Sequence, residues 1–171
     1  MFDRALTLVR EALGAGESRA AAVDGGGHAT GVRRQATANL GTLLRTCDAV
    51  GACLAVPRLP GVPEALARGN TLRHPVCMHG VGDPLRWLES ERAAGSRILG
   101  VELADEAIRL ADLPAARGCT VAVLGHEQHG IPPEALDLLD AVVEIPMMGT
   151  GLSLNVAVAG SLVLYRLAGL L

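Results

Sequence analysis

Two glycine-flanked polar loops follow apolar, strand-like runs in the C-terminal half of the chain. The run at residues 120–124 leads into the segment GHEQHGIP at 125–132, and the run at 142–145 leads into PMMGTGLSLN at 146–155. In open α/β sheets, ligands bind outside the carboxyl ends of the strands. We therefore expect these two loops to form a binding site.

The sequence lacks the complete motifs of three familiar chemistries, two of which the first loop partly resembles. Gly125 and Gly130 have the separation found in a phosphate-binding loop, but an Ile-Pro pair follows where Lys and Ser or Thr are required. His126 and His129 are three residues apart in a loop, whereas a zinc protease needs two histidines four apart on a helix. No Gly-x-Gly-x-x-Gly fingerprint occurs in the sequence, which disfavours a nicotinamide-dependent oxidoreductase.

The histidines and cysteines elsewhere predict neither a metal site nor a secreted protein. His74, Cys77 and His79 are close in sequence, but no second pair of ligands with matching spacing accompanies them, so we expect no metal. No secretory signal precedes the cysteines. We expect a cytoplasmic protein with reduced thiols at its four scattered cysteines: Cys47, Cys53, Cys77 and Cys119.

The most hydrophobic segment, residues 152–171, raises the question of a membrane span. Four polar residues interrupt it, and it follows a loop, so we expect a buried helix and no membrane association. The interrupting residues are Ser153, Asn155, Ser161 and Arg166.

The composition fits one globular domain of 171 residues, 50% of which are hydrophobic. Only three residues are aromatic, which weakens the case for an RNA module that stacks bases on a sheet. The net charge is −3, but residues 1–86 carry ten Arg against seven Asp and Glu, and residues 87–171 carry five against eleven. The arginines between residues 31 and 73 suit phosphate binding, although a genomic composition bias explains an Arg-rich, Lys-free chain equally well.

Apolar periodicity predicts an α/β protein with a mostly parallel sheet and helices on both faces, because short apolar runs alternate with helical patterns. Residues 1–36 are expected to form a helix at 2–13 and a loop or flexible segment at 17–35, ahead of a domain at 37–171. Asp83 and Pro84 form an N-cap and first-turn pair. The expected helices are at 39–50, 63–68, 84–94, 132–139 and 153–167, and the expected strands are at 52–56, 97–103, 119–124 and 141–145, with a further apolar run at 74–78.

Three segments, taken together and in order, resemble the motifs of SpoU/TrmH-type methyltransferases in the SPOUT superfamily. The first is NLGTLLRTCDAVG at 39–51, and the second is LGHEQHGI at 124–131. The third is IPMMG at 145–149 followed by SLNVAVA at 153–159. Their order and spacing make the joint match specific, and it covers the chain from residue 37 onward.

This resemblance implies an S-adenosylmethionine-dependent RNA methyltransferase that acts on a ribose 2′-hydroxyl, with a C-terminal trefoil knot as an exception to the rule against threaded loops. It implies a homodimer with the active site at or near the subunit interface. The sequence of the first motif most resembles that of enzymes that modify a D-arm guanosine of tRNA. Ribosomal RNA is the other substrate class. By the same resemblance, Leu124, Gly125, Gly130, Ile145, Met147 and Leu154 hold the cofactor, and Asn39, Arg45, Glu127, Ser153 and Asn155 line the methyl-transfer site.

Simpler structural roles exist for each proposed catalytic residue. Asn155 and Ser153 precede an apolar helix and suit capping, as does Asn39 before its own apolar run. Glu127 suits a solvated loop, and Arg45 lies one helical turn from Asp48, which suits a surface ion pair. Only the joint match to the motifs favours the functional interpretation.

Arg45 is the residue to which the resemblance assigns activation of the hydroxyl. Holding an arginine neutral near pH 7 costs on the order of 7 kcal/mol. We therefore expect Arg45 to stay cationic, to bind the adjacent phosphate and to stabilise the developing alkoxide. The alternative to catalysis is a dimer of the same fold that binds RNA or cofactor without transferring a methyl group.

Overall fold

The computed structural model describes residues 5–9, 28–58, 77–125, 130–151 and 153–171. In this part of the chain, seven strands form one sheet in the order β3-β2-β1-β6-β4-β7-β5, and every neighbouring pair is parallel. The strands are β1 (Ala5–Val9), β2 (Cys53–Pro57), β3 (Met78–Val81), β4 (Arg97–Val101), β5 (Ile108–Arg109), β6 (Thr120–Leu124) and β7 (Ala141–Glu144). The predicted α/β class with a parallel sheet is confirmed.

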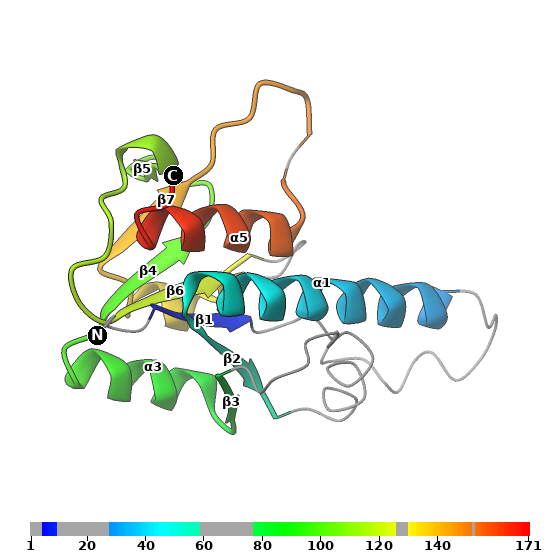
Figure 1. Cartoon of the computed structure of the whole chain (residues 1–171), viewed down its shortest axis with the longest axis horizontal. Coiled ribbons are helices and arrows are strands. Elements are labelled where there is room, and N and C mark those ends of the chain that lie inside the picture. The colour runs from blue at the N-terminus through cyan, green and yellow to red at the C-terminus, as the bar shows by residue number, and fades with distance from the viewer. Residues whose placement is uncertain (1–4, 10–27, 59–76, 126–129, 152) are drawn as a thin grey trace.

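Helices cover both faces of this sheet, as Figure 1 shows. One face is covered by α1 (His28–Val50) and α5 (Val156–Leu167), and the other by α3 (Pro84–Ala93) and α4 (Pro133–Leu136). All five residues of β6 are buried because helices cover the strand on both faces. Leu124 packs among residues of α1 and α5, whereas Val121 and Val123 pack among residues of α3 and α4. A strand that contributes to the core on both faces has the continuous apolar sequence expected of a parallel sheet.

The N-terminal prediction is wrong in two places. Strand β1 replaces the helix predicted at residues 2–13, and it lies between β2 and β6 in the sheet. Its five residues, ALTLV, are apolar enough for either structure, and pairing with two neighbouring strands decides the outcome. Helix α1 begins at His28, inside the predicted loop at 17–35, and continues through the predicted domain boundary at residue 37.

The remaining elements agree with their predictions to within a few residues. Asp83 caps α3 as expected, because its Oδ1 accepts hydrogen bonds from the backbone N–H groups of Leu85 and Arg86 at 3.1 and 3.2 Å. The apolar pattern did not predict two short elements, β5 and a 3₁₀ turn at Leu110–Asp112, and β3 shares only Met78 with the apolar run expected at 74–78. The helix predicted at 63–68 lies outside the described residues, as does most of the run at 74–78.

The expectation of four reduced thiols is also wrong, because Cys53 and Cys77 form a disulfide. These residues stand directly before Leu54 and Met78, which pair between β2 and β3, so the strand register brings the two cysteines together. The side chain of His79 lies on the same side, with Nε2 3.6 Å from the sulfur of Cys77. The sulfurs of Cys53 and Cys77 are thus bonded to each other, while Cys47 and Cys119 remain thiols.

The apolar C-terminal segment forms the buried helix that was expected. Val163, Leu164 and Leu167 of α5 are at most 2% exposed. Among the described residues, no helix has the length and apolar character needed to cross a membrane.

Candidate functional site

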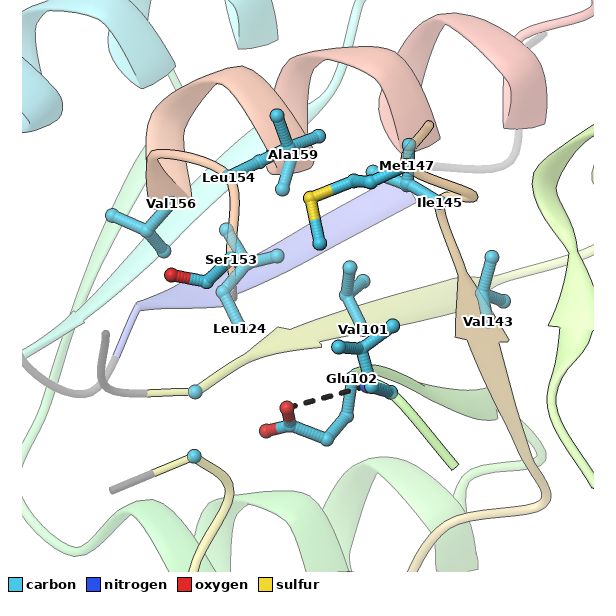
Figure 2. Close-up of a pocket in the computed structure, with 13 residues that line it drawn as sticks. Val101, Glu102, Leu124, Val143, Ile145, Met147, Ser153, Leu154, Val156 and Ala159 are labelled. Carbon is cyan, nitrogen blue, oxygen red and sulfur yellow. Dashed lines mark hydrogen bonds between the residues drawn. The ribbon is translucent and has the colours of Figure 1, made fainter. Parts of the chain in front are cut away.

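A cavity of about 530 Å³ opens at the carboxyl ends of β4, β6 and β7. Residues of α5 and of the segment before it complete the wall (Figure 2). Its volume lies within the usual range for small-molecule sites. The predicted catalytic residue Ser153 lines this cavity. All six residues predicted to hold a cofactor line it as well: Leu124, Gly125, Gly130, Ile145, Met147 and Leu154.

Most of the cavity wall is apolar. Side chains from four elements contribute: Val101 ends β4, Leu124 ends β6, Val143 belongs to β7 and Ala159 to α5. Figure 2 shows Ile145 and Met147 at one end of this apolar surface and Glu102 at the other. A ligand with an apolar or aromatic body and a few polar groups fits such a wall.

Two glycines shape the part of the wall that follows β6. A Cβ atom at Gly125 would lie 2.5 Å from the carbonyl carbon of Gly130 and 2.7 Å from the backbone nitrogen of Ile131. Only glycine therefore permits the two ends of this loop to approach so closely. Gly130 itself has φ +66°, a left-handed conformation that favours glycine. These glycines explain the first and last positions of the GHEQHG segment without any phosphate-binding role.

Glu102 lines the cavity and was missed by the sequence analysis. It follows β4 directly, and its carboxylate accepts a hydrogen bond from the backbone N–H of Ile131 at 3.2 Å. The strand prediction at residues 97–103 placed Glu102 inside a strand and so hid its position in a loop. An acidic residue at the carboxyl end of a strand, at the same sheet edge as the two loops, was the available signal.

Asn39 and Asn155 are brought together from motifs 116 residues apart in the sequence: Nδ2 of Asn155 donates to Oδ1 of Asn39 at 3.0 Å. Oδ1 of Asn155 also accepts from the backbone N–H groups of Ala157 and Val158, so Asn155 does cap α5. Asn39 is 7% exposed and lies within α1, which excludes the alternative that it caps a helix. The capping role of Asn155 and its contact with Asn39 therefore coexist.

Of the other three predicted catalytic residues, the two that the structure describes, Arg45 and Ser153, share no hydrogen bond with the Asn39–Asn155 pair. Arg45 is on the exposed side of α1, where its Nε donates to the carbonyl oxygen of Gly41 at 3.2 Å. It does not line the cavity in its own chain. Ser153 lines the cavity and is exposed. Glu127 lies outside the described residues.

An adenosyl sulfonium compound fits this arrangement on the chemistry of the wall. The apolar side chains suit an adenine ring, and the close approach of Gly125 to Gly130 and Ile131 brings both ends of the loop after β6 into the cavity wall. The carboxylate of Glu102 suits a cationic group. The cavity and the strand order together define an α/β protein with a small-molecule site at the carboxyl edge of a parallel sheet.

Comparison with known proteins gives that class a family. Residues 32–165 match the model of the SpoU rRNA Methylase family. The chain is 34% identical over 133 residues to tRNA (guanosine(18)-2′-O)-methyltransferase of Escherichia coli (strain K12), covering 75% of this chain and 56% of that enzyme. The chain belongs to the SpoU methylase family, and it spans little more than half the length of this curated relative.

Solved structures show the same fold. The TrmH/SpoU tRNA-modifying enzyme of A. aeolicus superposes with a TM-score of 0.69 at 24% identity, covering 98% of this chain and 75% of that one. An AdoMet-bound rRNA methyltransferase from Sinorhizobium meliloti superposes with a TM-score of 0.65 at 25% identity, covering 96% of this chain and 55% of that one.

Proposed function

We propose that this protein is an S-adenosylmethionine-dependent RNA methyltransferase that methylates a ribose 2′-hydroxyl. The observation that carries the proposal is the convergence of the three motifs. Residues of the second and third motifs line the same cavity, and Asn39 of the first motif is hydrogen-bonded to Asn155 of the third. Membership of the SpoU methylase family supports the same activity. The cavity, hereafter the donor cavity, is then the site of S-adenosylmethionine.

The C-terminal part is proposed to form the trefoil knot of this family. The donor cavity is built from the segments that follow β4, β6 and β7 together with α5. Met147, Ser153 and Leu154 line this cavity together with Gly125 and Gly130, which supports the proposal. Limited proteolysis with and without the donor tests this arrangement, because a threaded C-terminal segment should stay resistant once the donor is bound.

The donor supplies a methyl group on a sulfonium: the ribose oxygen forms the new C–O bond, the C–S bond breaks, and sulfur keeps the electron pair. The hydroxyl proton passes to a phosphate oxygen or to water. Arg45 stays cationic and stabilises the developing alkoxide. Asn39 and Asn155 fix the start of α5, and hence the position of Ser153 beside the donor cavity.

We propose a homodimer in which Arg45 acts on the partner's donor cavity. Arg45 lies on the exposed side of α1 and outside the cavity of its own chain, which supports this assignment. Mixing Arg45→Ala and Asn155→Ala subunits, each of which is expected to be impaired alone, tests it. Mixed dimers should regain methyl transfer at up to about one of their two sites. No recovery of transfer at all would assign Arg45 to the site of its own chain.

The proposed substrate is tRNA, with a D-arm guanosine as the first choice and rRNA as the second, and the proposed location is the cytoplasm. The name of the Escherichia coli relative supports the tRNA assignment. Transfer of a tritiated methyl group to total tRNA and to rRNA, followed by mapping of the 2′-O-methyl position, distinguishes the two substrates. Donor binding without transfer to either RNA would favour a non-catalytic binding protein.

A further inference from the structure

Glu102 is the charged group of the donor cavity. Of the described residues that line this cavity, it alone has an ionisable side chain, and none of them is Arg, Lys or His. Glu102 is half-buried, and Figure 2 shows its side chain beside Val101 at one end of the cavity. Its charge therefore faces a largely apolar wall, where a nearby charge is screened less than in water.

Two backbone groups hold the carboxylate in place. Oε1 accepts from the N–H of Leu103 at 3.3 Å, and Oε2 accepts from the N–H of Ile131 at 3.2 Å. A Cβ at Gly130 would lie 2.5 Å from Oε2, so the glycine at this position leaves room for the carboxylate. Each carboxylate oxygen has two lone pairs, and each keeps one acceptor site beyond these hydrogen bonds.

We propose that Glu102 makes the donor cavity selective for the cationic methyl donor over its neutral demethylated product. This inference rests on the proposed function. S-adenosylmethionine carries a sulfonium and an ammonium against one carboxylate, and transfer of the methyl group removes the sulfonium charge. The carboxylate of Glu102 attracts the donor more strongly than S-adenosylhomocysteine, so transfer itself weakens the attraction and favours release of the product.

Glu102→Gln tests the charge while keeping an oxygen that accepts from Ile131. Titration calorimetry with S-adenosylmethionine and with S-adenosylhomocysteine gives the ratio of their dissociation constants. We expect the Kd of the donor to rise about tenfold and that of the product to change less than about twofold. Glu106→Gln is the matched control, because Glu106 is an exposed acid of the same post-strand segment and does not line the cavity.

Equal loss of both ligands in Glu102→Gln would overturn the inference and leave Glu102 as a support for the loop. An unchanged ratio with unchanged affinities would overturn it as well. A second measurement needs no variant: salt should weaken binding of the donor to the unmodified protein more than binding of the product. If the unmodified protein binds neither ligand, the proposed function fails too. If the unmodified protein binds the donor and transfers the methyl group, but Glu102→Gln leaves the ratio of the two dissociation constants unaltered, only the role of Glu102 is removed.

Discussion

The donor cavity and the region around Asn39, Asn155 and Arg45 are built in different ways. The cavity is enclosed by the ends of three strands and by α5, and its shape is set by buried packing within one chain. The second region, here called the acceptor side, depends on one side-chain hydrogen bond between α1 and α5 and on an exposed arginine. A cavity fixed by packing is formed before a ligand binds, whereas the acceptor side, in the proposed function, is completed by RNA and by a partner subunit.

Arg45→Ala should have the largest effect on methyl transfer. Removing a cation that stabilises developing negative charge costs about 10²- to 10³-fold in rate. Arg45→Lys should be impaired severely as well, because an ammonium lacks the planar fork of the guanidinium. Single-turnover transfer measures the rate, and calorimetry should show unchanged donor binding.

Arg86→Ala is the control for this comparison, since Arg86 is an exposed arginine on α3 on the other face of the sheet. Its transfer rate should stay within about twofold. Near-normal turnover in Arg45→Lys would refute the role of the guanidinium. Loss of donor binding in Arg45→Ala would show that the acceptor side and the cavity are not separate.

Gly125→Ala should have the next largest effect, and it acts on the cavity instead. The added Cβ has to move the backbone at Gly130 and Ile131, and overpacking of this kind costs about 1–3 kcal/mol. We expect donor affinity to fall at least about tenfold while RNA binding, measured by filter retention, changes little. Gly118→Ala is the control, because a Cβ there has no neighbour within 4 Å. Unchanged donor affinity in Gly125→Ala would mean that the loop tolerates displacement.

The sequence predicted the cavity better than the elements around it. Its six predicted cofactor residues lie on one cavity because the motifs follow strands whose carboxyl ends share one sheet edge. The roles of these residues stay predictions. Glu102 was missed because the apolar pattern extended the predicted strand to residue 103, past the end of β4.

Features that depend on partners distant in the sequence escaped prediction. Strand β1 was taken for a helix because its apolar residues fit either structure, and only its pairing with β2 and β6 decides between the two. The Cys53–Cys77 disulfide requires the register of β2 against β3, which no local pattern contains. The sequence placed Asn39 and Asn155 in one predicted site, but it did not predict the hydrogen bond between them.

Asn155→Ala and Asn155→Asp separate the cap from the contact with Asn39. Alanine removes both and should lower the free energy of unfolding by about 1 kcal/mol and transfer by about tenfold. Aspartate still caps α5 but has no N–H to donate to Oδ1 of Asn39, so it should restore stability and leave transfer impaired. Denaturant unfolding and single-turnover transfer give the two quantities.

Ser161→Ala is the matched control for this pair, since it removes another hydrogen bond between α1 and α5, the one between the hydroxyl groups of Ser161 and Thr46. Its transfer rate should remain normal although stability falls. Full recovery of transfer in Asn155→Asp would assign the whole effect to helix capping and would remove Asn39 from the acceptor side.

Reduction of the Cys53–Cys77 disulfide should have the smallest effect on transfer, because β2 and β3 lie at the sheet edge away from β4, β6 and β7. A crosslink that closes a loop of this length stabilises a fold by about 3 kcal/mol. Cys77→Ser should lower stability by up to this amount with donor affinity unchanged, and Cys119→Ser should change neither. Thiol titration of the unfolded, unreduced protein should find the two thiols of Cys47 and Cys119. Four thiols would show that the crosslink is absent, and weaker donor binding after reduction would show that the far edge of the sheet helps to shape the cavity.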